Sequence, residues 1–140
     1  MRNVFPGELN AWQVFFRERS EVVAVYLFGS HGTEFEHPDS DIDLGIVFSH
    51  PVSLSDELDI DAALSMVLHS DRIDLINLNR APIALQFRVL SEGLLVCERD
   101  YLLHSDFIER VIKQYWDYQF TYLRFSEDYN RALREGYEHG

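Results

Sequence analysis

The sequence predicts an α/β fold with a small mixed sheet flanked by helices and a long C-terminal helix. β-branched and aromatic runs of strand length alternate with segments whose apolar residues recur at helical spacing. The four prolines fall where one element gives way to another, and no repeat, low-complexity tract or linker interrupts the chain. The 140 residues are therefore expected to form one domain, 1–140, with a core at about 8–98.

Eight elements follow from these patterns. Their predicted order is a helix after Pro6 that ends near Arg19, strands at 22–28 and 42–48, a helix opened by Ser53 and Asp56, a strand at 72–78, a helix from Pro82 to about Glu92, a strand at 94–98 and a helix from Tyr101. Ser53 and Asp56 stand three residues apart, as in a capping box. The runs VVAVYLF and IDLGIVF are rich in the β-branched and aromatic residues that favour strands.

The C-terminal segment, about 101–136, carries two apolar stripes. The first has heptad spacing and the second lies beside it: Tyr101, His104, Ile108, Val111, Tyr115, Tyr118, Tyr122, Phe125 and Tyr129, then Ile112, Trp116, Phe120 and Leu123. Together they exceed what a single packed face needs. We expect the residues near the sheet to join the core and Tyr122, Phe125 and Tyr129 to bind a protein partner; the alternative is that the whole helix packs over the core.

The charge excludes several classes of protein. A formal charge of −12, with only one lysine among 12 basic residues, repels nucleic-acid backbones, so a polynucleotide partner is not expected. The longest apolar run, 22–28, is too short to span a bilayer, and the first ten residues lack the apolar core of a signal peptide. With a single cysteine no intrachain disulfide is possible. We therefore expect a cytoplasmic protein with no membrane partner.

Three aspartates are candidate metal ligands. Asp41, immediately before the strand at 42–48, and Asp43, within it, share one face, because successive strand side chains point to opposite faces. Asp74 lies near the start of the next predicted strand and joins them if the two strands are neighbours. Two carboxylates ~5 Å apart repel by about 3 kcal/mol at an effective dielectric constant of 20, a cost that a divalent cation removes. All-oxygen ligation suits Mg²⁺ or Mn²⁺.

Gly29 and Ser30 supply a candidate phosphate-binding turn. Glycine lets the backbone approach a phosphate, and the serine adds a hydroxyl donor. A Gly-Ser pair alone is ordinary turn chemistry; its position ten residues before Asp41-x-Asp43 is what makes it informative.

The arrangement of Gly29-Ser30, ten residues and then Asp41-x-Asp43 within PDSDIDL resembles the polymerase-beta-like nucleotidyltransferase superfamily. Its minimal branch, the MNT proteins, is the most similar, and many of these are antitoxins paired with HEPN-domain ribonuclease toxins. The resemblance implies that Gly29, Ser30 and the neighbouring Ser40 bind ATP, that Asp41 and Asp43 bind metal ions, and that Asp74, by strand order alone, completes the catalytic site.

The same resemblance implies a reaction and a partner. AMP would pass from ATP to a tyrosine of a cognate HEPN toxin, neutralising it, and the two proteins would form a hetero-oligomer. Two alternatives stay open. One is an antitoxin that acts by binding and occlusion alone, which the acidic residues Glu34 and Glu36 between the two motifs would permit. The other is nucleotide transfer to a small molecule such as an aminoglycoside.

Ordinary structural roles compete with these interpretations. Asp74 lies two residues after Arg72, on the same strand face, and could be its salt-bridge partner. The six histidines show no metal-binding spacing, so we expect them at the surface or in loops. Cys97 is expected to be a small buried apolar residue.

Overall fold

The computed structural model describes the backbone of residues 6–28, 42–68 and 73–139. Its elements are α1 (Pro6–Arg17), β1 (Val22–Phe28), β2 (Ile42–Phe48), α2 (Leu54–Leu68), β3 (Ile73–Asn77), α3 (Ile83–Glu92), β4 (Leu94–Glu98) and α4 (Tyr101–His139). This is the predicted order. Helix α1 ends slightly earlier than predicted because the chain turns at Arg19, whose N–H donates to Phe16 and whose C=O accepts from Val22, both at 3.1 Å.

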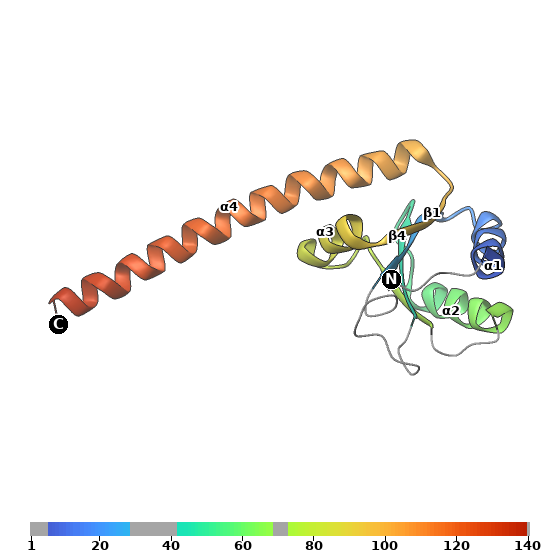
Figure 1. Cartoon of the computed structure of the whole chain (residues 1–140), viewed down its shortest axis with the longest axis horizontal. Coiled ribbons are helices and arrows are strands. Elements are labelled where there is room, and N and C mark those ends of the chain that lie inside the picture. The colour runs from blue at the N-terminus through green and yellow to red at the C-terminus, as the bar shows by residue number, and fades with distance from the viewer. Residues whose placement is uncertain (1–5, 29–41, 69–72, 140) are drawn as a thin grey trace.

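The strands form one mixed sheet in the order β3-β2-β1-β4. β1 pairs antiparallel with β2 and with β4, whereas β2 and β3 are parallel. A parallel pair needs a crossover connection, and α2 supplies it. Figure 1 shows α1 and α2 on one side of this sheet and α3 on the other, with α4 leaving the body of the protein as a long arm. The α/β class with a small mixed sheet is confirmed.

Alternation along the strands divides the core into two layers. One face of β2 contributes Leu44, Ile46 and Phe48 to a cluster with α1 and α2, whereas Val47 belongs to the cluster on the opposite face. Each large apolar side chain that is fully buried contributes about 1.5–3 kcal/mol. The largest on the first face are Trp12, Phe16, Leu44, Ile46, Ile60 and Leu64; the second face holds Tyr26, Leu78, Val89, Phe107 and Val111.

Helix α4 is packed only along its first part. Phe107 and Val111 are buried against the second face of the sheet. The ring of Tyr115 stacks on Phe87 of α3, with centroids 3.7 Å apart and planes 3° from parallel. From Trp116 to residue 136 nearly every side chain is exposed, and none is buried. Within the ranges given above, no helix is both long and apolar enough to cross a membrane.

His104 corrects one of the sequence predictions. Expected at the surface or in a loop, it is 3% exposed on α4. Its Nε2 lies 2.6 Å from the Tyr26 hydroxyl, and its Nδ1 lies 2.5 Å from a carboxylate oxygen of Glu98. With the proton on Nδ1, the imidazole donates to Glu98 and accepts from Tyr26. Burial, and then the charge of Glu98, raise the pKa of Tyr26 to about 12, so its hydroxyl remains a donor.

Cys97 is half-buried, packed beside the first cluster, and so is less enclosed than predicted. Burial raises the pKa of its thiol, an effect that the charges of Arg99 and Arg17 partly offset. A neutral thiol is consistent with the packing role that the sequence predicts.

The hydrogen bond between Tyr26 and His104 is expected to hold α4 on the sheet. Tyr26→Phe leaves His104 Nε2 buried without a donor, which should lower the free energy of unfolding by about 1–3 kcal/mol. Urea unfolding followed by circular dichroism measures the change. Tyr101→Phe, which removes the same hydroxyl from a ring that is 69% exposed, is the matched control and should stay within about 0.5 kcal/mol of wild type. Equal stability of the two variants would contradict the assignment.

Candidate active site

Two of the predicted aspartates are brought together at the start of the parallel strands. Asp43 of β2 and Asp74 of β3 are register partners, so their Cα atoms are about 4.8 Å apart. The neighbouring residues Leu44, Ile73 and Leu75 point into the cluster beneath α1 and α2. Both aspartates therefore point to the opposite face of the sheet. Asp43 is half-buried and Asp74 is exposed.

The end of β1 lies beside Asp43 at the same edge of the site. Phe28, its last residue, pairs with Asp43 across the antiparallel ladder. Gly29 and Ser30 follow Phe28 directly in the sequence. The predicted nucleotide-binding residues Gly29, Ser30 and Ser40, the predicted ligand Asp41 and the alternative ion-pair partner Arg72 lie outside the described residues. Their assignments stay predictions, whereas the structure brings Asp43 and Asp74 side by side.

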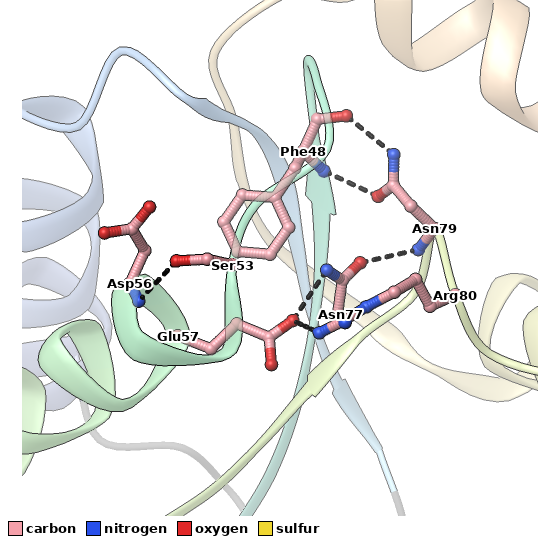
Figure 2. Close-up of polar contacts among 7 residues, drawn as sticks. All are labelled: Phe48, Ser53, Asp56, Glu57, Asn77, Asn79 and Arg80. Atoms are coloured by element: carbon pink, nitrogen blue, oxygen red, sulfur yellow. Dashed lines mark hydrogen bonds and ion pairs between the residues drawn. The ribbon is translucent and has the colours of Figure 1, made fainter.

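A side-chain clamp at the far end of β2 and β3 fixes their register (Figure 2). The side-chain amide of Asn79 donates to the Phe48 C=O and accepts from its N–H, both at 2.8 Å. Asn77 accepts from the Asn79 N–H at 3.0 Å and donates to Glu57 of α2 at 2.7 Å. Arg80 forms an ion pair with the same carboxylate. These bonds tie the end of β3 to β2 and to the crossover helix.

The start of α2 is capped beside this clamp. Ser53 Oγ accepts a hydrogen bond from the Asp56 N–H at 3.1 Å, as the capping-box pattern predicts (Figure 2). The cap fixes where α2 begins, and so where Glu57 stands relative to Asn77. The capping signal that was read from the sequence therefore contributes to the placement of Asp74.

Asp61 of α2 is a further acidic neighbour that the sequence analysis missed. Burial and then the charge of Asp74 raise the pKa of its carboxyl group, while a hydrogen bond with Ser65 lowers it. Its Oδ1 is buried, and no hydrogen-bond partner for it is found among the described residues. The Asp59-x-Asp61 spacing on the helix was its only sequence signal.

The donors of this site suit a hard cation. Asp43 and Asp74 offer carboxylate oxygens and no nitrogen or sulfur, which is the chemistry that Mg²⁺ and Mn²⁺ prefer. Within residues 6–28, 42–68 and 73–139, no group of three or more His, Cys, Asp or Glu side chains is arranged to hold a metal ion. The third predicted ligand, Asp41, lies outside these ranges. The two described carboxylates fit the expected cation as a partial ligand set.

Comparisons with known proteins agree with this geometry. The family model "Polymerase beta, Nucleotidyltransferase" matches residues 10–102. No curated protein matches the chain. Among solved structures, a chain of a toxin–antitoxin complex with AMP-PNP aligns with a TM-score of 0.70 at 23% identity, covering 86% of this chain and 96% of that one.

Two further complexes contain similar chains. One is the toxin–antitoxin MntA–HepT, with a TM-score of 0.65 at 21% identity over 86% of this chain and 94% of the other. The second is a tri-AMPylated Shewanella oneidensis HEPN toxin with its MNT antitoxin, with a TM-score of 0.64 at 22% identity, covering 86% and 96%. At these identities the likeness shows a shared fold.

Asp61→Asn is expected to stabilise the fold at neutral pH. Because the pKa of Asp61 is raised, its ionisation costs folding energy above that pKa, and the cost disappears as the pH falls below the unfolded value of about 3.9. The amide should add stability at pH 7, by less than about 1 kcal/mol at this partly exposed site. Urea unfolding at pH 7 and near pH 3.5 tests this. The exposed Asp59→Asn is the control, and a destabilised Asp61→Asn at pH 7 would refute the account.

Proposed function

Since the chain belongs to the polymerase beta nucleotidyltransferase family, we propose that it transfers AMP from ATP to a tyrosine of a cognate HEPN ribonuclease and thereby acts as its antitoxin. The observation that carries the proposal is the register of Asp43 with Asp74, in a chain that also has Gly29-Ser30 followed at the family spacing by Asp41-x-Asp43. The proposed setting is the cytoplasm, in a hetero-oligomer of enzyme and toxin.

The residues of the site have two proposed roles, phosphate binding and metal binding. Gly29, with Ser30 and Ser40, would hold the phosphates of ATP through main-chain N–H groups and hydroxyls. Asp41, Asp43 and Asp74 would hold Mg²⁺, or Mn²⁺ in its place, which when bound neutralises the charge on the attacking and leaving oxygens. Most of the catalytic effect then comes from positioning and electrostatic stabilisation.

The reaction balances as an in-line displacement. The tyrosine oxygen forms a bond to the α-phosphorus, the bond from that phosphorus to the bridging oxygen breaks, and pyrophosphate leaves with the electron pair. Asp74 is the proposed acceptor of the hydroxyl proton. Its exposure on β3, the edge strand, supports this role because a side chain of another protein can reach it. Asp43 is half-buried between β1 and β3, which suits a residue that positions the nucleotide.

The choice of a protein acceptor rests on the structural neighbours. One comes from a complex of a tri-AMPylated HEPN toxin with an MNT antitoxin, and another comes from a toxin–antitoxin complex with the ATP analogue AMP-PNP. The same fold also permits an antitoxin that acts by occlusion alone. The long exposed part of α4 favours that alternative, since it offers a binding surface that needs no catalysis.

One experiment separates transfer from occlusion. The chain is incubated with ATP, Mg²⁺ and its candidate toxin, the R-x4–6-H ribonuclease encoded by the adjacent gene. The mass of the toxin is then measured by mass spectrometry. We expect its mass to rise by multiples of AMP and its ribonuclease activity to fall. Asp41→Ala/Asp43→Ala should abolish both effects, because removing two ligands leaves the nucleotide unpositioned.

A matched control is available in the same chain. Asp59→Ala/Asp106→Ala removes two exposed aspartates away from the site and should keep wild-type transfer. An unchanged toxin mass with the wild-type chain would refute AMP transfer. Full neutralisation by Asp41→Ala/Asp43→Ala would instead establish occlusion.

A further inference from the structure

The first apolar stripe of α4 continues beyond the domain that it packs on. His104 and Val111 of this stripe are buried, as is Phe107 beside them, and Tyr115 is half-buried against Phe87 of α3. At the same three- and four-residue steps the stripe then reaches four exposed aromatic residues: Tyr118, Tyr122, Phe125 and Tyr129, which are 45–69% exposed. Of the helices and strands that the structure describes, Figure 1 shows none beside this outer part of α4. The pattern that buries the inner part thus extends, unburied, along the outer part.

A second exposed stripe runs along the same helix. Ile112, Trp116, Phe120 and Leu123 are 42–66% exposed. They follow the helical repeat of 3.6 residues and lie to one side of the first stripe. Near the domain, Ile108 and Ile112 line a shallow hollow of about 450 Å³ on this side. The helix therefore carries apolar surface over an arc wider than one packed face requires.

The exposed aromatic area is large enough for a specific interface. The six side chains Trp116, Tyr118, Phe120, Tyr122, Phe125 and Tyr129 are each 45–69% exposed. At about 150–250 Å² per aromatic side chain, they present roughly 700 Å². The largest patch on a monomer is usually about 300–600 Å². A stable complex buries about 800 Å² on each partner.

Charge distinguishes this segment from the rest of the chain. Residues 113–136, the outer half of α4, hold four basic and four acidic residues, so the whole formal charge of −12 falls on the remainder. The charged side chains Lys113, Asp117, Arg124 and Arg131 share the helix face opposite the first stripe, where they border Phe120 of the second stripe. A neutral, aromatic helix thus extends from a strongly acidic domain.

We propose that the outer half of α4 docks into an apolar groove between two helices of the same partner that receives AMP, an inference that rests on the proposed function. Two adjacent stripes call for two contacting elements, whereas a single helix of a second copy would cover only one of them. A ribonuclease needs a positively charged surface to bind RNA, and the acidic domain of this chain is complementary to such a surface. A second copy of this chain would instead bring a second formal charge of −12.

The test measures binding in the absence of ATP. The purified ribonuclease, with the histidine of its R-x4–6-H motif replaced, is immobilised, and the full chain is passed over it in biolayer interferometry. Tyr122→Ala/Phe125→Ala in the first stripe and Trp116→Ala/Leu123→Ala in the second should each raise Kd by about 30-fold or more. Alanine preserves the helix, which circular dichroism checks.

Arg124→Ala/Arg131→Ala on the charged face should change Kd by less than about fivefold. If either stripe variant binds the ribonuclease with wild-type affinity, the proposed docking into a groove is overturned. The groove is also overturned if the wild-type chain sediments as a dimer, both stripe variants sediment as monomers, and both variants still bind the ribonuclease with wild-type affinity. The occupant of the stripes would then be a second copy. Tight binding without AMP transfer refutes the proposed function alone, and AMP transfer with unaffected stripe variants refutes the docking alone.

Discussion

The parallel register of β2 and β3 is the constraint on which the site depends. Strand side chains alternate with a period of two, so a slip by one residue would send Asp74 to the face beneath α1 and α2, away from Asp43. The Asn79 amide prevents that slip by bonding both main-chain groups of Phe48. The bonds from Asn77 and Arg80 to Glu57 extend the restraint to the crossover helix. Neutral amides and one ion pair at one end of the strands thus place two carboxylates at the other.

The sheet also separates the catalytic and docking functions that we propose. The site lies at the ends of β1, β2 and β3, whereas α4 starts after β4 at the opposite edge of the sheet. The hydrogen bonds of the buried His104 to Tyr26 and Glu98 connect α4 with two strands. This anchor sets the direction in which the outer half of α4 leaves the domain. Because Tyr26 lies on β1, the strand that leads to Gly29 and Ser30, one strand carries both the anchor and the approach to the nucleotide.

The local patterns of the sequence predicted the strands and the order of the helices, because each depends on periodicity within a few residues. They placed Asp74 beside Asp43 only on the condition that the two strands are neighbours, since that pairing depends on the crossover through α2. Asp61 could not be found in this way, since its raised pKa arises from burial and from a strand that only the crossover brings near. The burial of His104 depends on Tyr26, 78 positions away. The Asn79 clamp was missed because an asparagine after a strand is also ordinary turn chemistry.

The central claim is that Asp43 and Asp74 belong to one metal-dependent nucleotide site, and its most direct test is Mn²⁺ binding followed by electron paramagnetic resonance with a non-hydrolysable ATP analogue present. We expect an immobilised Mn²⁺ signal for the wild-type chain, and an apparent Kd that rises by about tenfold or more in Asp43→Asn and in Asp74→Asn. Asp59→Asn should bind as wild type does. An Asp74→Asn variant with unchanged Mn²⁺ affinity would contradict the claim, because the carboxylate that the β2–β3 register places beside Asp43 would then have no part in the site.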